Sequence, residues 1–470
     1  MHADSSPSRP SVILPALTIG FAAAVVMWCI GFITHLPGLR AATPVVGVLM
    51  LLAHLGAGLI AVRTVAARPV RIATCAGWIA GCVNLLVLGS LLTPADPSRA
   101  APAHAALIAL GYIVASGVLA CIGAVIASAI GIRPSSGAAE VGRERWAARF
   151  AGVTALSAAP VILSGGLVTS AQAGLAVHDW PGSYGVLMWM YPLSRMTGGV
   201  YYEHAHRLFG SLVGLTTVVL TILAFTATRR SLPRIAVVIA LLAVIAQGIM
   251  GGQRVVTADA PADQDLRVLT PQSVPEDAPG NFALTTDNPT SRALAVAHGV
   301  FGQLTVAWLA ACAVVMSPRY ASPRPDAMFP DRFLRFAAGG ALAALLLQLL
   351  LGATTRHLHH MHVLMAHLTF AFVVLVMCMI AGLRAAKHRG TPVRRPGMAL
   401  AHASGLQVLL GFGAMFSVLP YDRTGPEPWH AVLLATVHHA LGAALLAAAA
   451  MLVVWTFRLT RRAAEPAPAQ

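Results

Sequence analysis

Long apolar segments recur from one end of this chain to the other, and they limit the folds open to it. Of its 470 residues 57% are hydrophobic and 10% are charged, with a mean hydropathy of +0.73. That composition lies outside the range of soluble globular proteins. Each segment is long enough to cross a bilayer as a helix, so we predict an all-α integral membrane protein with about twelve transmembrane helices. The segments are residues 11–34, 43–62, 72–93, 101–132, 148–170, 206–228, 233–252, 293–316, 333–354, 360–383, 397–418 and 429–457.

The net charge of +15 is distributed as in a membrane protein. With the N-terminus inside, 23 of the 32 basic residues fall on the inner side and 9 on the outer side. Acidic residues split the other way, 6 inside and 11 outside. This follows the positive-inside rule and predicts a multi-pass protein of the cell (inner) membrane with both termini in the cytoplasm. It speaks against a nucleic-acid partner, which needs basic residues on one folded surface; the partner expected here is membrane lipid.

The helices fall into groups separated by polar stretches. Residues 1–132 form a four-helix extension of undetermined role, and residues 133–147 form a cytoplasmic linker. Residues 148–316 and 333–457 are two similar four-helix sets, and 458–470 is a cytoplasmic tail. Membrane folds are often built from such repeats, with sites between them. We therefore predict an eight-helix bundle of two repeats plus the extension, with long outer loops at 171–205 and 253–292.

Four histidines recur at matching places in the two repeats. His206 and His298 lie near the outer ends of the second and fourth helices of the first repeat, and His367 and His438 do so in the second. Histidine inside a membrane is costly and usually functional. Imidazole is a standard axial ligand of haem iron, and helix bundles are standard places for it. The spacing predicts two bis-histidine haem sites at one depth, towards the outer face.

Other histidines compete with these four for the ligand positions. His439 adjoins His438, but the two point about 100° apart, so only one faces a given iron. Residues 356–362 read Arg-His-Leu-His-His-Met-His, so His357, His359, His360 and His362 compete with His367, and the cluster is also a candidate copper or zinc site. In the extension, His54 and His104 echo the repeat, and we favour an accessory or scaffolding role for that bundle.

Charged residues accompany the histidines at the outer helix ends. Glu203 stands three residues before His206, so both share a helix face. A carboxylate there can move protons or steady a developing positive charge. Arg207, Arg254 and Arg356 can each bind a haem propionate through a bidentate contact.

At these motifs the chain resembles the haem A synthase family over roughly residues 148–457. The likeness rests on the loop from Gly174 to Pro181, on Glu203-x-x-His206-Arg207 with Gly210 and Gly214, and on the stretch from Gln247 to Val255. His298 with Gln303, His367 with Ala371, and Ala435-Thr-Val-His438 complete it.

The resemblance implies an oxidoreductase that converts the C8 methyl of haem O to a formyl group by successive hydroxylations, for cytochrome oxidase biogenesis. By that likeness His206 and His298 hold the substrate haem, His367 and His438 hold a haem b cofactor, and Glu203 is the catalytic carboxylate. Implied partners are haem O synthase, a quinol or other electron donor, and a second copy of the chain.

The sequence departs from the family's pattern in three ways. His178 stands where the loop usually has proline, and Leu368 follows His367 where many members have arginine. The outer-loop cysteine pair of some members is missing, since all six cysteines fall in apolar segments. The alternative function is a bis-histidine dihaem cytochrome that transfers electrons from quinol without modifying haem; it needs the same histidines but not Glu203. A transporter fits less well, because it predicts charge or broken helices at mid-membrane.

Overall fold

The all-α membrane architecture is confirmed in a computed structural model, which describes residues 12–92, 104–136, 142–258, 288–323, 328–358, 360–419 and 427–460. Twelve helices in these ranges are long and apolar enough to cross a membrane. They are α1 (Ile13–Thr34), α2 (Thr43–Thr64), α3 (Pro69–Leu88), α4 (Ala105–Ala129), α5 (Arg143–Ser170), α6 (Gly198–Ala227), α7 (Ser231–Val256), α8 (Pro289–Met316), α10 (Arg332–Leu358), α11 (Met361–Ala386), α12 (Arg394–Val418) and α13 (Trp429–Leu459). The middle of the predicted 253–292 loop, His359 and the tail from residue 461 lie outside the described residues.

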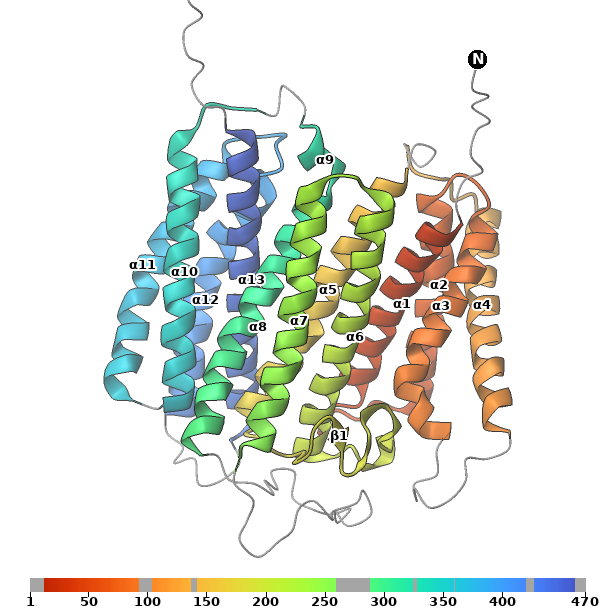
Figure 1. The fold of residues 1–470 in the computed structure, drawn as a ribbon, viewed down its shortest axis with the longest axis horizontal. Helices are drawn as coiled ribbons and strands as arrows, with labels where there is room; N and C mark the ends of the chain where they lie inside the picture. Colours follow the sequence, from red (N-terminus) through yellow and green to blue (C-terminus); the bar gives the residue numbers. More distant parts are fainter. Residues whose placement is uncertain are drawn as a thin grey trace, which may run out of the picture. The chain divides into compact units, whose positions relative to one another are not determined.

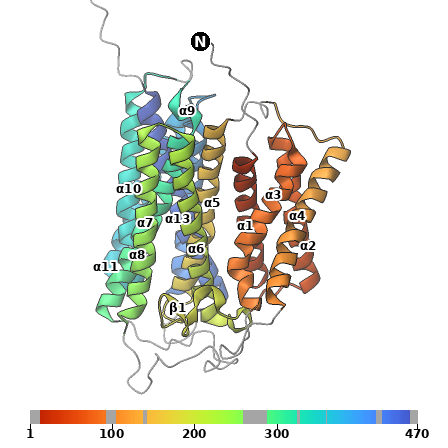
Figure 2. The same cartoon turned by 45° about the vertical axis from the view of Figure 1, so that its right-hand side comes forward.

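Contacts divide the chain into two compact units, Met1–Val153 and Thr154–Gln470. In the first unit α1–α4 pack side by side (Figures 1 and 2). Glycines let the backbones approach closely, as is common between membrane helices. A Cβ added at Gly58 would lie 2.2 Å from the Ala120 carbonyl oxygen, and one added at Gly77 would lie 2.3 Å from that of Ser116. Close packing of small residues thus holds α4 against α2 and α3.

The second unit contains α6–α8 and α10–α13, together with the larger part of α5. Figure 1 shows α8 and α13 next to each other in its middle, with α10–α12 beyond them. A buried apolar cluster fills the space between α8, α10, α11 and α13, with Leu345, Cys378 and Leu446 among its members. The histidine-bearing helices α8 and α13 are therefore neighbours in the bundle.

Two predicted boundaries are wrong. The first repeat was expected to start its second helix at residue 206, but α6 begins at Gly198. The early turns are helical because a packed loop buries their side chains, including Tyr201, Glu203 and His204. The linker predicted over 133–147 ends earlier, since α5 begins at Arg143.

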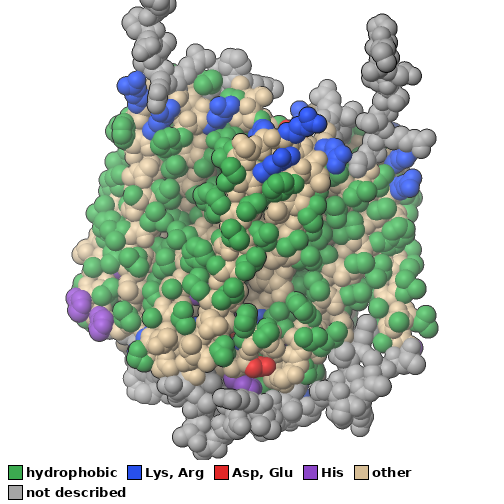
Figure 3. All heavy atoms as spheres, in the orientation of Figure 1, with side chains coloured by type: hydrophobic (Ala, Val, Ile, Leu, Met, Phe, Trp, Pro, Cys, Tyr) green, Lys and Arg blue, Asp and Glu red, His purple; other side chains and the backbone are tan. Residues whose placement is uncertain are grey.

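Charged side chains gather at one end of the helices of the second unit. Figure 3 shows lysine and arginine at that end, above a broad apolar belt. There the buried carboxylate of Asp331 caps α10 by accepting the Leu334 amide proton at 3.0 Å and pairs with Arg384 and His388, each at 2.8 Å. Burial raises the pKa of Asp331, but these hydrogen bonds outweigh it, and the net pKa lies below the ordinary value. Asp331 thus ties the start of α10 to the end of α11.

Candidate functional site

The four histidines predicted from the sequence come together as two pairs within the second unit. The ring centroids of His206 and His298 are 6.1 Å apart with the planes at 84°. Those of His367 and His438 are 6.4 Å apart with the planes at 80°. A metal–nitrogen bond of about 2.0 Å, plus about 1.1 Å from nitrogen to ring centre, puts two opposed imidazole ligands roughly 6 Å apart. Both pairs have the spacing that one iron between the rings requires.

Each histidine ring lies against a glycine on the preceding helix. A Cβ added at any of these four glycines would come within 3.1 Å of the ring's Cε1 atom, so a larger residue would displace the ring. The contacts join Gly165 to His206, Gly251 to His298, Gly352 to His367 and Gly411 to His438. All four ligand positions are therefore built in the same way, from one antiparallel helix pair.

Three of these helix pairs also use a glutamine, placed four residues before the glycine. The amide nitrogen of Gln348 donates to the His367 carbonyl oxygen at 2.9 Å, and that of Gln407 donates to the His438 carbonyl at 3.0 Å. The Gln247 side chain is oriented so that its amide nitrogen and its amide oxygen both have partners. The nitrogen donates to the His298 carbonyl oxygen at 3.3 Å, and the oxygen accepts from the Gly302 amide at 3.0 Å. The fourth pair has Val161 at this place. Sequence analysis missed the pattern, although Gln-x-x-x-Gly recurs three times.

The structure distinguishes His438 from its neighbour His439. The ring Nδ1 of His438 lies 3.2 Å from the Gln407 carbonyl oxygen, its Nε2 lies 3.4 Å from the Gln407 amide nitrogen, and its ring is paired with that of His367. His439 points elsewhere, with its Nδ1 3.4 Å from the Gln303 amide of α8 and its ring against Gly166 of α5. Geometry therefore favours His438 as the partner of His367.

The histidine-rich stretch 356–362 does not form a metal site in the described structure. His360 and His362 stack on each other with centroids 5.5 Å apart, and His362 is exposed. Among the residues that the structure describes, no group of three His, Cys, Asp or Glu side chains is placed to hold a metal ion; His359 lies outside them. This arrangement favours His367 over His362 in the second pair.

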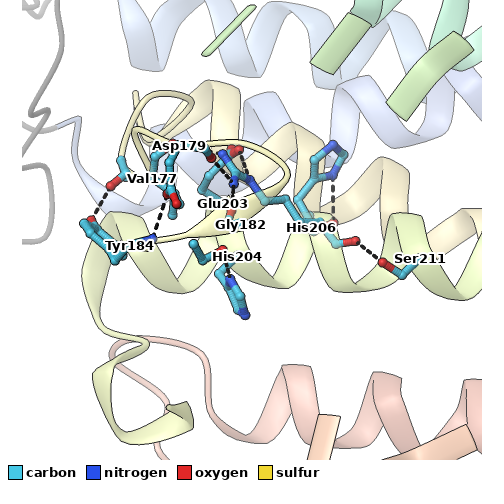
Figure 4. Close-up of polar contacts among 12 residues, drawn as sticks. Val177, Asp179, Gly182, Tyr184, Glu203, His204, His206 and Ser211 are labelled. Atoms are coloured by element: carbon cyan, nitrogen blue, oxygen red, sulfur yellow. Dashed lines mark hydrogen bonds and ion pairs between the residues drawn. The ribbon is translucent and has the colours of Figure 1, made fainter. Parts of the chain in front are cut away.

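A loop between α5 and α6 is fastened to the helix turn that carries Glu203 and His206. Arg207 donates from Nε to Glu203 Oε1 at 3.0 Å. Its terminal nitrogens donate to the carbonyl oxygens of Asp179 at 2.7 Å, Gly182 at 3.0 Å and Val177 at 2.9 Å. Figure 4 shows the loop lying over α6, with His206 and His204 pointing away from different faces of the helix. Arg207 therefore holds the loop, and with four donors engaged it is poorly placed for the propionate predicted for it.

The loop has its own internal supports. The carboxylate of Asp179 accepts the amide protons of Tyr184 at 2.7 Å and Gly185 at 2.9 Å. The Tyr184 hydroxyl donates to the Ala176 carbonyl at 2.5 Å, and burial raises the pKa of this phenol. The ring of His178, the departure from the family's proline, packs edge-on against Tyr184 at 4.9 Å. Histidine thus takes part in the packing of this loop.

Comparison with known proteins finds one family whose model matches part of the chain. Residues 148–364 match the model of the COX15-CtaA family, described as cytochrome oxidase assembly protein. This region of the chain is therefore similar to the COX15-CtaA family. The match includes Glu203, His206 and His298 and ends three residues before His367. No curated protein sequence matches the chain.

Two further arginines lie near the pairs, and they differ in their hydrogen-bond partners. Arg254 follows Gly251 by one turn of α7, and its guanidinium is so close to Gly174 that an added Cβ would lie 2.5 Å from Nη1. Its buried Nε has no hydrogen-bond partner among the described residues. Arg356 instead donates to the Thr169 carbonyl at 2.9 Å and pairs with the buried Glu427 at 3.5 Å. Arg254 is thus the better placed of the two to bind an added anion.

The extension does not reproduce a histidine pair in its described residues. His54 is buried, and its Nδ1 lies 2.8 Å from the Met50 carbonyl of the preceding helical turn. His104 is exposed at the start of α4. A different polar cluster is buried nearby in this unit, where Asn84 accepts from Trp28 at 3.1 Å and donates to Tyr112 at 2.9 Å. Such a network is a common way to join membrane helices.

Proposed function

We propose that this cytochrome oxidase assembly protein is a haem A synthase, which oxidises the C8 methyl of haem O to a formyl group by successive hydroxylations. The observation that carries the proposal is the pair of iron-compatible histidine sites in a COX15-CtaA chain, at 6.1 and 6.4 Å between rings. One site is needed for the substrate haem and one for a resident haem b. His206 and His298 would hold the first, and His367 and His438 the second.

The haems supply the redox chemistry when they are bound, and the protein's residues hold and orient them. The Nδ1 atoms of His206 and His438 lie 3.1 and 3.2 Å from backbone carbonyl oxygens. These hydrogen bonds favour the Nδ1–H tautomer, in which Nε2 would bind the iron. At His438 the iron would take the place of the Gln407 amide nitrogen, which lies 3.4 Å from Nε2. The glycines behind the rings allow the helices to approach and keep each imidazole in one place.

Glu203 is the residue best placed for proton transfer at the first pair. It sits one helical turn before His206, is 7% exposed, and is held at Oε1 by Arg207. Oε2 is then the oxygen available to take up or deliver a proton. An adjacent guanidinium fixes the orientation of a carboxylate, as a general base requires.

Arg254 would bind a propionate of the substrate haem. Its guanidinium lies near the end of α7, behind Gly174 of the docked loop, and arginine binds carboxylates in a bidentate manner. Arg207 would act on the haem only indirectly, through the loop. Arg356 would have to release Glu427 or share its charge to make a similar contact.

The setting of the reaction follows from the charge distribution. We place the protein in the cell (inner) membrane, with both termini in the cytoplasm and the histidine pairs towards the outer face. Haem O would arrive from haem O synthase, and electrons from a quinol or another donor. A homo-oligomer is compatible with this arrangement.

The deciding experiment is haem extraction after co-expression with haem O synthase. Appearance of haem A in the extract, absent from cells with the empty vector, is the expected result. Bound haem b together with unchanged haem O would overturn the proposal. That outcome would favour a dihaem electron-transfer cytochrome, a function for which the ion pair of Glu203 with Arg207 would be purely structural.

A further inference from the structure

Each of the four ligand histidines lies against a glycine of the preceding antiparallel helix, and we call such a pair of helices a helix-pair unit. The molecule has four copies of this unit, and one copy differs from the other three. In three copies a glutamine lies four residues before the glycine, and a small residue lies four residues after the histidine. Gln247 thus meets Gly302, and Gln407 meets Gly442, where an added Cβ would lie 3.2 Å from the Gln407 amide nitrogen. In the fourth copy Val161 and Gly210 occupy the corresponding positions. Valine has no hydrogen-bonding side-chain group, so this copy lacks the amide contact.

Each of the three glutamines is hydrogen-bonded to the helical turn that carries its histidine. Each donates to the carbonyl oxygen of the ligand histidine, at 2.9 Å for Gln348, 3.0 Å for Gln407 and 3.3 Å for Gln247. A side-chain amide bonded there resists movement of that turn, and so of the ring that it carries. Both ligands of the second pair have this support, but only one ligand of the first pair does.

His206 is held through its ring. Its Nδ1 lies 3.1 Å from the Val161 carbonyl oxygen and 3.3 Å from the Ser164 hydroxyl. Both contacts are to the ring and leave its backbone turn without the amide. The space where an amide would lie is open, because an added Cβ at Gly210 meets no atom within 4 Å.

We propose that the residue four positions before each glycine sets how firmly an axial histidine is held, and that Val161 makes His206 the exchangeable ligand of the molecule. Gln348 and Gln407 then keep the haem of the second pair resident, whereas the haem of the first pair can enter and leave. The inference rests on the proposed function, because a synthase must release its product haem at one site and retain its cofactor at the other.

The test measures haem loss from the purified full chain loaded with haem b, using excess apomyoglobin as acceptor. The wild-type protein should lose haem in two phases, and His298→Ala should remove the fast phase. Val161→Gln should slow the fast phase roughly three- to tenfold, the effect of one net hydrogen bond. Val161→Leu, which adds bulk without an amide, should leave it unchanged.

The converse variants act on the second pair. Gln348→Met and Gln407→Met should speed the slow phase by a similar factor and shift the low-spin ferric EPR signal, which depends on the ring orientations. Gln303→Met, a buried glutamine outside the four units, should alter neither. If either variant fails to fold, Val161→Gln decides alone.

The outcomes separate this inference from the proposed function. Equal effects of Val161→Gln and Val161→Leu on the fast phase, or a fast phase that belongs to the second pair, would overturn the inference while haem A formation could still occur. Failure of the chain to bind haem b at all would overturn both. If the two phases respond as described but no haem A forms in cells, the result would support the inference that Val161 makes His206 the exchangeable ligand. It would at the same time refute the proposal that the protein is a haem A synthase.

Discussion

The rings of His367 and His438 face each other with centroids 6.4 Å apart, across two helices whose histidines are 71 positions apart in the sequence. His206 and His298 repeat the relationship at 6.1 Å. Neither distance would be expected of histidines that merely stabilise helix ends, since an interfacial histidine has no need of a second imidazole at metal-bridging distance. The repeated spacing is the observation that supports the proposed haem sites.

Replacing Glu203 with glutamine should stop the reaction and spare haem binding. Glutamine can still accept from Arg207 but cannot take up a proton, and loss of a general base costs roughly 100-fold or more in rate. Haem extraction after co-expression would show haem O in place of haem A, with an unchanged bis-histidine spectrum. Glu427→Gln is the matched control, because Glu427 is a buried carboxylate that pairs with a different arginine, Arg356. Full conversion by the Glu203 variant would remove it from the mechanism.

Alanine at Gly165 should weaken the first pair selectively. The new methyl group would lie 2.9 Å from Cε1 of His206 and push the ring out of line, at a cost of about 1–3 kcal/mol. Haem affinity at that pair should fall roughly 5- to 100-fold. Haem titration of the purified protein measures this. Gly210→Ala, where the added atom meets nothing within 4 Å, should bind as wild type; a loss there as well would mean that the helix, rather than the ring, is sensitive.

Substitution of the two adjacent histidines should separate their roles. His438→Ala should abolish the low-spin spectrum of the second pair, because it removes an axial ligand. His439→Ala should retain that spectrum, because its ring contacts Gln303 instead. Absorption and EPR spectra of the reduced and oxidised proteins provide the comparison. The reverse result would exchange the two assignments.

Arg207→Met should release the loop from α6. The variant loses four hydrogen bonds and leaves Glu203 as an unpaired buried charge, which typically costs about 3–5 kcal/mol. The backbone amides of Tyr184 and Gly185 donate hydrogen bonds to the Asp179 carboxylate within the loop. Hydrogen exchange at these two amides should become faster in the variant. Arg207→Lys should give a smaller increase. Exchange as slow as in the wild-type protein would show that the aromatic packing alone keeps the loop in place.

Asp331→Asn should destabilise the basic end of α10 and α11 in a pH-dependent way. Since the pKa of Asp331 is lower in the folded protein, its contribution is complete above the unfolded value of about 3.9 and is lost as the pH falls through the folded value. The variant should unfold more easily at neutral pH by roughly 1–3 kcal/mol. Thermal unfolding in detergent at pH 7 and near pH 3 would show this difference shrinking at the lower pH. A difference independent of pH would assign the effect to helix capping alone.

The amino-acid sequence by itself determined the membrane class, the number of helices and the four histidines, because apolar length and the position of a costly polar residue are local properties. It placed the start of α6 eight residues too late, since these early turns are packed against a loop whose Ser183 and Tyr191 contact His204. Which histidine of an adjacent pair faces its partner, and which arginine is already engaged, depend on helix rotation and on residues distant in the chain. Only the tertiary structure could decide that His438 rather than His439 meets His367, that Arg207 holds the loop, and that Val161 stands where the other three helix pairs place a glutamine against the histidine's helix.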